Sequence, residues 1–552
     1  MIADIHITEK SFGDKTLMKD VKFSVDDGEK VGVVGRNGVG KSTLFGILSG
    51  KDTDYTGEVI FRRGITIATT AQEHHGLGDQ TVMSYILGGL PEYSKLKKII
   101  DEYPLTMGDN MRKIEEYTQA LERFDQKGFY QVEEKINREL SNFQLAGFGD
   151  RKISSLSGGQ KRLVEIVKIM HSEAHLALID EPTNHMDYIA KQQFIDWMNS
   201  QPHQAMLIIT HDRDVLGQVD RIVEIKDGQA VSYRGNYDAY LKQNAQATTA
   251  GMNNFEQIEK RIVNLKQKVL DYQRLKEKSR NPGTIQKFKR LENEARAELE
   301  ELSEMEKPTF WIDKESVGQL DYKSAERYGK FKSRNIRLSM KDASSRSQHV
   351  LVRAENVAVG IGERILFEDV NIDLREGEAI EIRGRNGAGK TTLIRMILAS
   401  GKSFDGGPVL YSGDIFLDPQ VRIGVYEQEI DERYLSDPLE KAIEKLYMSR
   451  DLSISDTKIR QLLADYLFTD ADRMTPLARL SGGQKARFQI IAMLANDPQL
   501  LILDEPTNHL DLPSIEELET ALTKYSGAIL YVSHDNYFRE KLGGKVVQIG
   551  AE

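Results

Sequence analysis

The chain has 552 residues, which exceeds one ordinary domain, so we expect two or three domains. Its 39% hydrophobic and 29% charged residues are typical of a folded protein, and no apolar run approaches the roughly 18 residues that cross a bilayer. Since the N-terminus also lacks signal-peptide features, we expect a cytoplasmic protein. The sequence has no cysteine, which excludes disulfides, thiolate zinc sites and cysteine-bound iron–sulfur clusters, and its net charge of −10 indicates no average preference for nucleic acid.

A phosphate-binding loop is predicted near the N-terminus. The apolar run 31–34 is followed by a Gly-rich loop and then by Lys41 and Ser42, and a strand, a loop and a helix in this order form a P-loop. Backbone N–H groups of such a loop surround the phosphates, the lysine bridges the β- and γ-phosphates, and the hydroxyl binds Mg²⁺. The predicted ATP-binding residues are Gly35, Arg36, Asn37, Gly38, Val39, Gly40, Lys41, Ser42 and Thr43.

An insertion is predicted after this loop. The segment from Gln72 to Ser157 is much longer than its counterpart in the second half of the chain, from Gln428 to Ser481. The extra residues fall at about 91–130, where apolar residues recur at helical spacing and are interrupted by Pro104 and Met107-Gly108. We expect an inserted helical hairpin here, and a simply longer helical subdomain is the alternative.

A second anion-binding helix and the catalytic carboxylates follow. Ser157, Gly158, Gly159 and Gln160 precede a basic helix and predict an N-capped helix end that approaches phosphate. Asp180 ends the apolar run 176–179, which places its carboxylate at the carboxyl edge of a parallel strand, where it can hold the metal. Glu181 is then the candidate for polarising the attacking water, and His211 for contacting the γ-phosphate.

A long helical hairpin is predicted between the halves. Apolar residues from Ile258 to Tyr272 follow a heptad seam, and a second helix runs from about Phe288 to Leu302. Asn281-Pro282-Gly283 predicts the turn, and each arm is expected to be roughly 30–35 Å long.

The hairpin carries a concentrated positive charge toward its turn. Residues 258–290 contain eleven Lys and Arg but only three acidic residues, although the whole chain is negative. A solvated face usually mixes charges, so we favour contact with a polyanion, recognised by backbone or shape because few aromatic residues accompany the charge. The predicted nucleic-acid contacts are Lys266, Lys268, Arg274, Lys276, Lys278, Arg280, Lys287, Lys289 and Arg290.

The first set of motifs recurs in the same order in the second half, which predicts two ATP-hydrolysing domains. Asp504 and Thr391 are the second metal-binding pair, and Glu505 and His534 are the second catalytic pair. The ATP-binding residues predicted in this half are Gly384, Arg385, Asn386, Gly387, Ala388, Gly389, Lys390, Thr391, Thr392, Ser481, Gly482, Gly483 and Gln484.

The Ser-Gly-Gly motifs resemble the signature of the ABC ATPase family, in which the signature of one domain completes the ATP site of the other. The resemblance implies a monomer with two composite sites formed by pairing of its own domains. It also implies metal contacts from Gln72 and Gln428 and an interdomain role for Asp187 and Asp511. An aromatic residue stacks on adenine in this family. Phe12 fits that role, whereas the second half offers Ile361, which implies weaker base stacking at the second site.

Across nearly its whole length the chain is similar to ABC-F proteins, which are ribosome-associated translation ATPases. The matching features are Asp-Glu-Pro-Thr-Asn-His in both halves, Tyr233-Arg-Gly-Asn-Tyr237 and the long basic linker. The resemblance implies that residues 252–306 reach the tRNA exit region near the peptidyl-transferase centre, beside P- or E-site tRNA and rRNA. It also implies that residues 91–130 form the arm of this family, directed to the tRNA-stalk side of the ribosome.

Other ATPases fit less well. Tandem ATPase subunits of sugar importers have short linkers and a degenerate half, and no transmembrane subunit is expected here. Repair and recycling members need cysteines, which this chain lacks. Within ABC-F, the short turn 279–284 and the arm-like insertion favour a general translation factor over an antibiotic-resistance protein.

The sequence thus predicts an α/β protein with two tandem P-loop ABC-type domains joined by a long antiparallel α-helical linker. The predicted domains are 1–241, with a helical arm at about 91–130, then the linker 242–349, and 350–552. ATP and Mg²⁺ are the expected cofactors. The segment 310–340 is given no role beyond connecting the hairpin to the second domain.

Overall fold

A computed structural model describes residues 1–550 apart from 13–14, 71–78, 107, 109, 185, 304, 306, 319, 321, 339–348, 403–406 and 428–429. The chain forms two compact units, one made of Met1–Tyr237 with Ile336–Glu552 and the other of Asp238–Asn335.

The first half is built on a six-stranded sheet. Three of its strands are short, mostly apolar runs in which every residue is buried, as is usual for central parallel strands. The last strand alone is antiparallel to its neighbour. In order across the sheet the strands are β5 (Ile67–Thr69), β6 (Leu176–Asp180), β7 (Ala205–Ile209), β3 (Lys30–Val34), β8 (Arg221–Lys226) and β9 (Gln229–Arg234).

An antiparallel sheet encloses the P-loop helix of this half. Its strands are β2 (Lys15–Val25), β1 (Ala3–Phe12) and β4 (Thr56–Phe61), and the helix is α1 (Lys41–Leu48). Apolar residues of both sheets and of α1 form one core, which holds the start of α1 at the carboxyl edge of β3.

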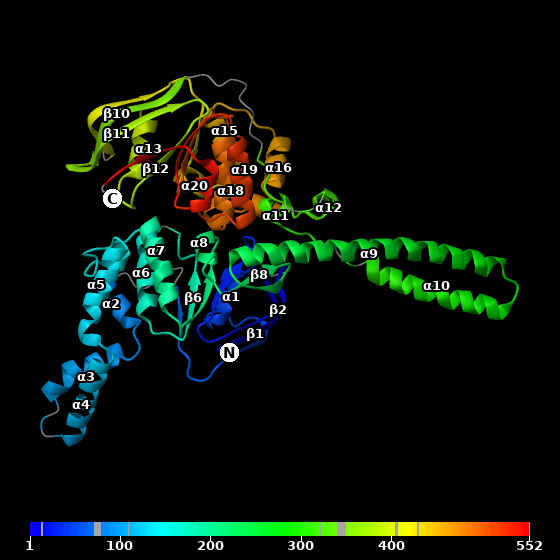
Figure 1. The fold of residues 1–552 in the computed structure, drawn as a ribbon, viewed down its shortest axis with the longest axis horizontal. Helices are drawn as coiled ribbons and strands as arrows, with labels where there is room; N and C mark the ends of the chain where they lie inside the picture. The colour runs from blue at the N-terminus through cyan, green and yellow to red at the C-terminus, as the bar shows by residue number, and fades with distance from the viewer. Residues whose placement is uncertain are drawn as a thin grey trace. The chain divides into compact units, whose positions relative to one another are not determined.

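Helices form a second core in this half. They are α2 (Val82–Gly88), α3 (Tyr93–Thr106), α4 (Met111–Gln126), α5 (Val132–Asn142), α6 (Gly158–His171), α7 (Tyr188–Ser200) and α8 (Arg213–Leu216), with the 3₁₀ turns η1 (Phe129–Gln131) and η2 (Ile153–Ser155). The predicted inserted hairpin is present as α3 and α4 (Figure 1), whose base is held by the rings of Tyr93, Phe124 and Phe129. The prediction that Pro104 interrupts the helix is wrong, because this residue lies in the last turn of α3.

The second half repeats the architecture. Its parallel sheet runs β14 (Ile423–Tyr426), β15 (Leu500–Asp504), β16 (Ala528–Val532), β12 (Ala379–Arg383) and β17 (Lys545–Gln548), and its antiparallel sheet β11 (Arg364–Arg375), β10 (Val350–Ile361) and β13 (Pro408–Leu417). Its helices are α13 (Lys390–Leu398), α14 (Glu432–Leu435), α15 (Leu439–Met448), α16 (Asp456–Asp465), α17 (Asp470–Arg473), α18 (Gly482–Leu494), α19 (Leu512–Lys524) and α20 (Asn536–Leu542), with the 3₁₀ turn η3 (Leu477–Arg479). The predicted duplicated α/β fold is confirmed.

The unit Asp238–Asn335 contains the predicted hairpin, formed by α9 (Tyr237–Lys278) and α10 (Pro282–Ser303), which lie side by side and antiparallel (Figure 1). Leu265, Val269 and Ala295 form the buried centre of the seam. The predicted length is wrong for the first arm. With 42 residues α9 extends to roughly 60 Å at 1.5 Å per residue, because it continues without a break from the first half. Pro282 begins α10 instead of lying in the turn, a position that suits its fixed φ.

The segment after α10 folds back onto α9. It contains α11 (Lys314–Gly318) and α12 (Tyr322–Phe331), and its Ile312, Tyr328 and Phe331 bury Met252 of α9. The Asn244 amide also donates a 2.9 Å hydrogen bond to the Trp311 carbonyl. These residues therefore stabilise the base of the hairpin, a role that the sequence did not predict.

Candidate active sites

The two P-loops have the same backbone geometry. Gly40 and Gly389 adopt left-handed φ values of 103° and 98° and cap the first turns of α1 and α13. A Cβ on Gly35 or Gly384 would lie 2.5 Å from a carbonyl oxygen of the neighbouring chain segment, so only glycine fits these positions. The glycines thus let each loop curl with its N–H groups at a helix N-terminus, which is an anion-binding arrangement.

Each P-loop lysine lies folded over its own loop. Lys41 Nζ donates to the carbonyls of Gly35 at 2.7 Å and Arg36 at 3.2 Å, and Lys390 Nζ donates to those of Gly384 at 2.9 Å and Arg385 at 3.1 Å. Burial lowers the pKa of both lysines. A phosphate at the loop would offer each ammonium an anionic partner in place of neutral carbonyls.

A hydroxyl and a carboxylate meet beside each loop. Ser42 Oγ donates to Asp180 Oδ2 at 3.1 Å, and Thr391 Oγ1 donates to Asp504 Oδ2 at 2.7 Å. The predicted metal-binding pairs are therefore adjacent in both halves, because each Asp ends a strand at the edge where the P-loop helix begins. Gln72 and Gln428, the other predicted metal contacts, lie outside the described residues.

The candidate catalytic glutamates occupy strained backbone positions. Glu181 and Glu505 have φ values of 47° and 51°, a left-handed conformation that is costly for a residue with a Cβ. Burial raises the pKa of Glu181 to about 8 and that of Glu505 to about 7. Glu505 is buried and Glu181 is partly buried, and a carboxyl with a raised pKa in each cavity is suited to proton transfer with water.

A histidine contacts each glutamate. His211 Nε2 lies 3.6 Å from Glu181 Oε1, and His534 Nε2 lies 3.3 Å from Glu505 Oε1. Burial lowers the pKa of His211 to about 3 and that of His534 well below its usual value, which favours the neutral form of both rings. Both ring nitrogens of His211 and Nε2 of His534 are buried without a hydrogen-bond partner among the described residues. These nitrogens are therefore available to a bound phosphate.

The two signature motifs form matched helix N-termini. Ser157 caps α6 and Ser481 caps α18, and each forms a capping box with the glutamine three residues later, Gln160 or Gln484. The helix dipole and the free N–H groups of the first turn favour an anion at both ends.

The first cavity combines residues of both halves. It has a volume of about 440 Å³. The lining residues from the first half include Lys41, Ser42, Asp180, Glu181 and His211, and those from the second half include Ser481, Gly482 and Gly483. The two halves are in contact at its rim. The side-chain amide of Asn37 donates a 2.9 Å hydrogen bond to the His509 carbonyl. Gly483 is also close to Asn37, because a Cβ at this position would lie 2.0 Å from Asn37 Nδ2.

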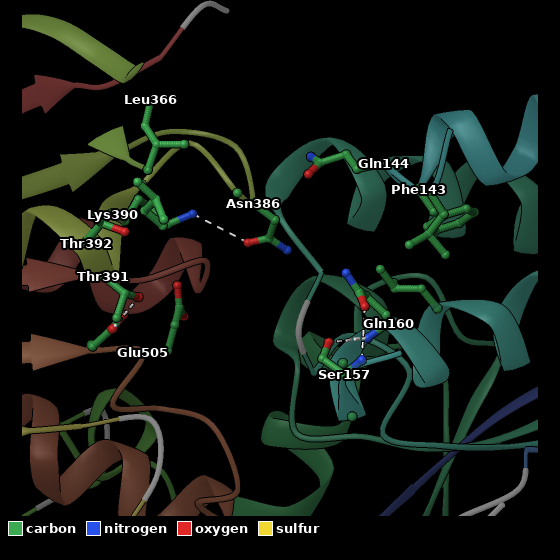
Figure 2. A pocket seen from close by; sticks show the side chains of 18 of the residues that line it. Phe143, Gln144, Ser157, Gln160, Leu366, Asn386, Lys390, Thr391, Thr392 and Glu505 are labelled. Carbon is green, nitrogen blue, oxygen red and sulfur yellow. Dashed lines mark hydrogen bonds between the residues drawn. The ribbon is translucent and has the colours of Figure 1, made fainter. Parts of the chain in front are cut away.

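The second cavity has the reciprocal pairing of P-loop and signature and a volume of about 770 Å³. Its histidine is placed differently, because His211 lines the first cavity whereas His534 lines the small neighbouring cavity of about 50 Å³. Lys390, Thr391 and Glu505 lie on one side, and Ser157 and Gln160 face them from the other (Figure 2). Other described lining residues are Phe143, Gln144, Leu145, Gly158, Gly159, Leu163, Ile361, Leu366, Asn386, Gly387, Gly389, Thr392, Asp504 and His509. Each cavity thus holds a P-loop and the opposite signature.

The sites differ at their edges. Ile361 lines the second cavity, whereas Phe12 is not among the described residues that line the first and is 55% exposed with Lys10 over its ring. The sequence reasoning missed Leu17 and Leu366, which line equivalent places and could have been found by aligning the two halves. It also missed Arg162, whose guanidinium donates 3.3 Å to the Asp180 carbonyl.

The predicted nucleic-acid contacts lie on the hairpin. Lys268 and Lys276 are half-buried, and Lys276 is bound to Glu292 at 2.6 Å. Arg290 contacts Glu294 on its own helix at 2.8 Å yet remains exposed. The other exposed members of the set are Lys266, Arg274, Lys278, Arg280, Lys287 and Lys289. The positive charge is therefore accessible mainly on both sides of the turn.

A duplicated α/β domain with a P-loop and an opposite signature at each of two cavities defines a tandem ABC-type ATPase. The sequence pattern of the family described as "ABC transporter" matches residues 18–184 and 367–508. The chain is 29% identical to ABC transporter F family member 2 of Arabidopsis thaliana, over 98% of this chain and 75% of that protein. The chain belongs to the ABC-F family of ATPases and binds and hydrolyses ATP.

Two other relatives have functional names. The chain is 27% identical to ribosome protection protein VmlR of Bacillus subtilis, over 96% of this chain and 83% of that protein. It is 28% identical to the energy-dependent translational throttle protein EttA of Mycobacterium tuberculosis, over 96% of this chain and 88% of that protein.

The fold is also shared with solved structures. A crystal structure of an archaeal ribosome recycling factor in complex with a ribosomal stalk protein superposes with a TM-score of 0.58 at 16% identity, covering 99% of this chain and 87% of that one. Among the described residues, no helix combines the length and apolarity needed to cross a membrane.

Proposed function

We propose that this protein is a cytoplasmic translation factor that binds the ribosome when ATP has closed its two halves, and that hydrolysis releases it. The observation that carries the proposal is the presence of two complete composite cavities in a chain that also has an exposed basic hairpin. Nucleotide at each interface would favour closure, because each signature helix end would contact the phosphates held by the opposite P-loop.

The ATP chemistry follows from the cavity walls. Lys41 and Lys390 bind the β- and γ-phosphates, and the signature N-termini of α18 and α6 cover the γ-phosphate from the other half. Glu181 and Glu505 orient and polarise the attacking water, and His211 and His534 hold the γ-phosphate through their unpaired ring nitrogens.

The donor set fits Mg²⁺, which takes oxygen ligands and usually keeps several waters. Ser42 with Asp180, and Thr391 with Asp504, supply a hydroxyl and a carboxylate at each site. Bound Mg²⁺ would neutralise charge that develops on the phosphates.

The hairpin supplies the contact with RNA. Its exposed lysines and arginines flank the turn between α9 and α10, where they can approach rRNA and P- or E-site tRNA near the peptidyl-transferase region. The names of VmlR and EttA support a ribosomal partner. The short turn and the α3–α4 hairpin favour a general role in elongation or rescue over antibiotic protection.

The test uses the double variant Glu181→Gln/Glu505→Gln, which binds ATP but cannot activate water. We expect it to co-sediment with ribosomes in ATP and not in ADP. Lys41→Ala/Lys390→Ala is the matched control, because it cannot hold the phosphates and should stay in the supernatant with either nucleotide. Failure of the Gln variant to co-sediment in ATP would overturn the ribosome proposal, even if its hydrolysis is abolished as expected.

A further inference from the structure

Lys191 of α7 is a buried cation at the interface of the two halves. Its side chain is 5% exposed, and its ammonium has three oxygen partners. Asp214 Oδ2 lies at 2.8 Å, Asp212 Oδ2 at 3.1 Å and the His534 backbone carbonyl at 2.9 Å. A lysine has three N–H donors, so this set satisfies it completely. The two aspartates raise the pKa of Lys191 despite its burial, and the ammonium is charged.

The third partner of Lys191 belongs to the second active site. The backbone N–H of His534 donates a 3.1 Å hydrogen bond to Glu505 Oε2, and the His534 ring lies 3.3 Å from Glu505 Oε1. A hydrogen bond to the His534 carbonyl therefore restrains the loop that carries the histidine against the catalytic carboxylate. Lys191 comes from the first half, so the restraint acts across the interface.

Neighbouring contacts reinforce the same loop. Asn536, two residues after His534, donates 2.8 Å to Asp214 Oδ2, the carboxylate that also holds Lys191. A small cavity of about 50 Å³ is lined by Lys191, His534 and both catalytic glutamates. The ammonium thus lies between the two sites. In the second site it bonds the backbone carbonyl of His534, and in the first site it bonds the side chain of Asp212, the residue after His211.

The second half of the chain has no equivalent of Lys191 and Asp214 that could form the same contact with the first site. In the register set by Asp187 and Asp511, Lys191 corresponds to Ile515, which has no hydrogen-bonding side chain. In the register set by His211 and His534, Asp214 corresponds to Tyr537, which cannot supply a carboxylate. Equivalent motifs are therefore supported by unequal surroundings.

We propose that Lys191 is a positioning residue that acts in trans on the second ATP site, holding His534 and Glu505 in their hydrolytic arrangement. The first site depends on it less, because Lys191 there contacts the side chain of Asp212, which the cap of α8 also holds, and not the His211 backbone. This inference rests on the proposed roles of the glutamates and histidines. Its consequence is that hydrolysis at the second site requires the α7 face of the first half to be docked, which couples that site to interdomain closure.

The test isolates each site. Glu181→Gln leaves only the second site able to hydrolyse, and Glu505→Gln leaves only the first. Lys191→Met keeps the length of the side chain and removes its charge and donors. In the Glu181→Gln background we expect kcat to fall roughly 10- to 100-fold with KM nearly unchanged, as for a displaced catalytic group. In the Glu505→Gln background kcat should fall by about threefold or less, since Lys191 there contacts only the side chain of Asp212, which its own helix cap also holds.

Three further variants separate positioning from general interface stability. Lys191→Arg keeps a charged donor and should restore most of the activity of the second site. Asn536→Ala removes a contact to the same aspartate without touching the His534 carbonyl and should have a small effect. Lys191→Met/Asp214→Asn removes one of the two carboxylates that Lys191→Met leaves without their cation, so it remains informative if Lys191→Met alone unfolds, which thermal unfolding would reveal.

Equal loss of kcat in the two backgrounds, or a loss in Asn536→Ala as large as in Lys191→Met, would overturn the inference. A different result would contradict the proposed catalytic roles of the glutamates. If Glu181→Gln/Glu505→Gln with native Lys191 still hydrolyses ATP at the full rate, the glutamate assignment is wrong whatever Lys191 does.

Discussion

The backbone amide of Asn37 in the first P-loop donates a 3.0 Å hydrogen bond to Asp511 of the second half. The reciprocal bond joins the Asn386 amide to Asp187 Oδ2 at 3.2 Å. Each aspartate also caps its own helix, since Asp511 accepts from the Ser514 amide and Asp187 from the Ala190 amide. One carboxylate therefore links a helix N-terminus to the opposite P-loop, so closure of the interface and the shape of the phosphate loop are coupled.

This link predicts separable effects at Asp511. Asp511→Ala should lower the free energy of unfolding by about 1 kcal/mol, the usual cost of removing an N-cap, and should weaken ATP binding at the first site. Asp511→Asn is the control, because asparagine caps a helix as well as aspartate but lacks the negative charge at the P-loop. Stability comes from chemical denaturation, and affinity from nucleotide titration of the Lys390→Ala background, in which only the first site binds.

We expect Asp511→Asn to retain stability and still lose affinity. Asp511→Ala with wild-type affinity at the first site would show that the aspartate serves only as a cap.

A second prediction concerns the fit of the signature against the P-loop. A Cβ on Gly483 would lie 2.0 Å from Asn37 Nδ2 and 2.7 Å from its Cγ, so Gly483→Ala should prevent closure at the first cavity. A Cβ on Gly482 would lie 3.4 Å from the His509 ring, which is ordinary contact, so Gly482→Ala should close more normally.

ATP-dependent closure can be measured by fluorescence transfer between labels on the two halves. Gly483→Ala combined with Asn37→Ala, which removes the clashing amide, should close again. Normal closure of Gly483→Ala alone would mean that the two surfaces do not approach this closely.

The P-loops, strand-end carboxylates and histidines were predictable because each motif fixes its own local geometry and because two copies exclude chance. The long α9 was harder, since residues 242–251, which follow its first turn, are small or polar and show no seam. Lys191 could not be predicted, because a lysine inside an amphipathic helix is usually a solvated residue and its partner His534 is far away in the sequence. Pairing across the halves came only from family resemblance, since neither motif contains a local signal for its partner.

A third prediction follows from the edge of the second cavity. Ile361 lines this cavity and is 54% exposed, so an aromatic ring is accommodated there without displacing core residues. Ile361→Phe should lower the Kd for ATP at the second site roughly fivefold or more, since stacking of a base on an aromatic ring is worth about 1–3 kcal/mol. The measurement is titration in the Lys41→Ala background. Ile361→Leu is the control, and an equal gain in both variants would exclude stacking as the cause.

The last prediction concerns the charge of the hairpin. Reversal of Lys278, Arg280, Lys287 and Lys289 to Glu should weaken ribosome binding in ATP, because these side chains are exposed on both sides of the turn. The slope of log affinity against log salt should also become shallower by about 0.7–0.9 for each phosphate that the variant no longer neutralises. Binding of the hydrolysis-deficient Glu181→Gln/Glu505→Gln protein is measured by sedimentation over a range of KCl concentrations.

The matched control exchanges a charge pair inside the same hairpin. Arg261 binds Glu298 at 2.7 Å and 2.9 Å, so Arg261→Glu/Glu298→Arg keeps the net charge and can keep the pair. It should leave affinity and salt slope unchanged, whereas loss of binding in both variants would indicate damage to the hairpin. If the charge-reversed protein binds with the native affinity and slope, the basic residues form a solvated face and other surfaces must hold the ribosome.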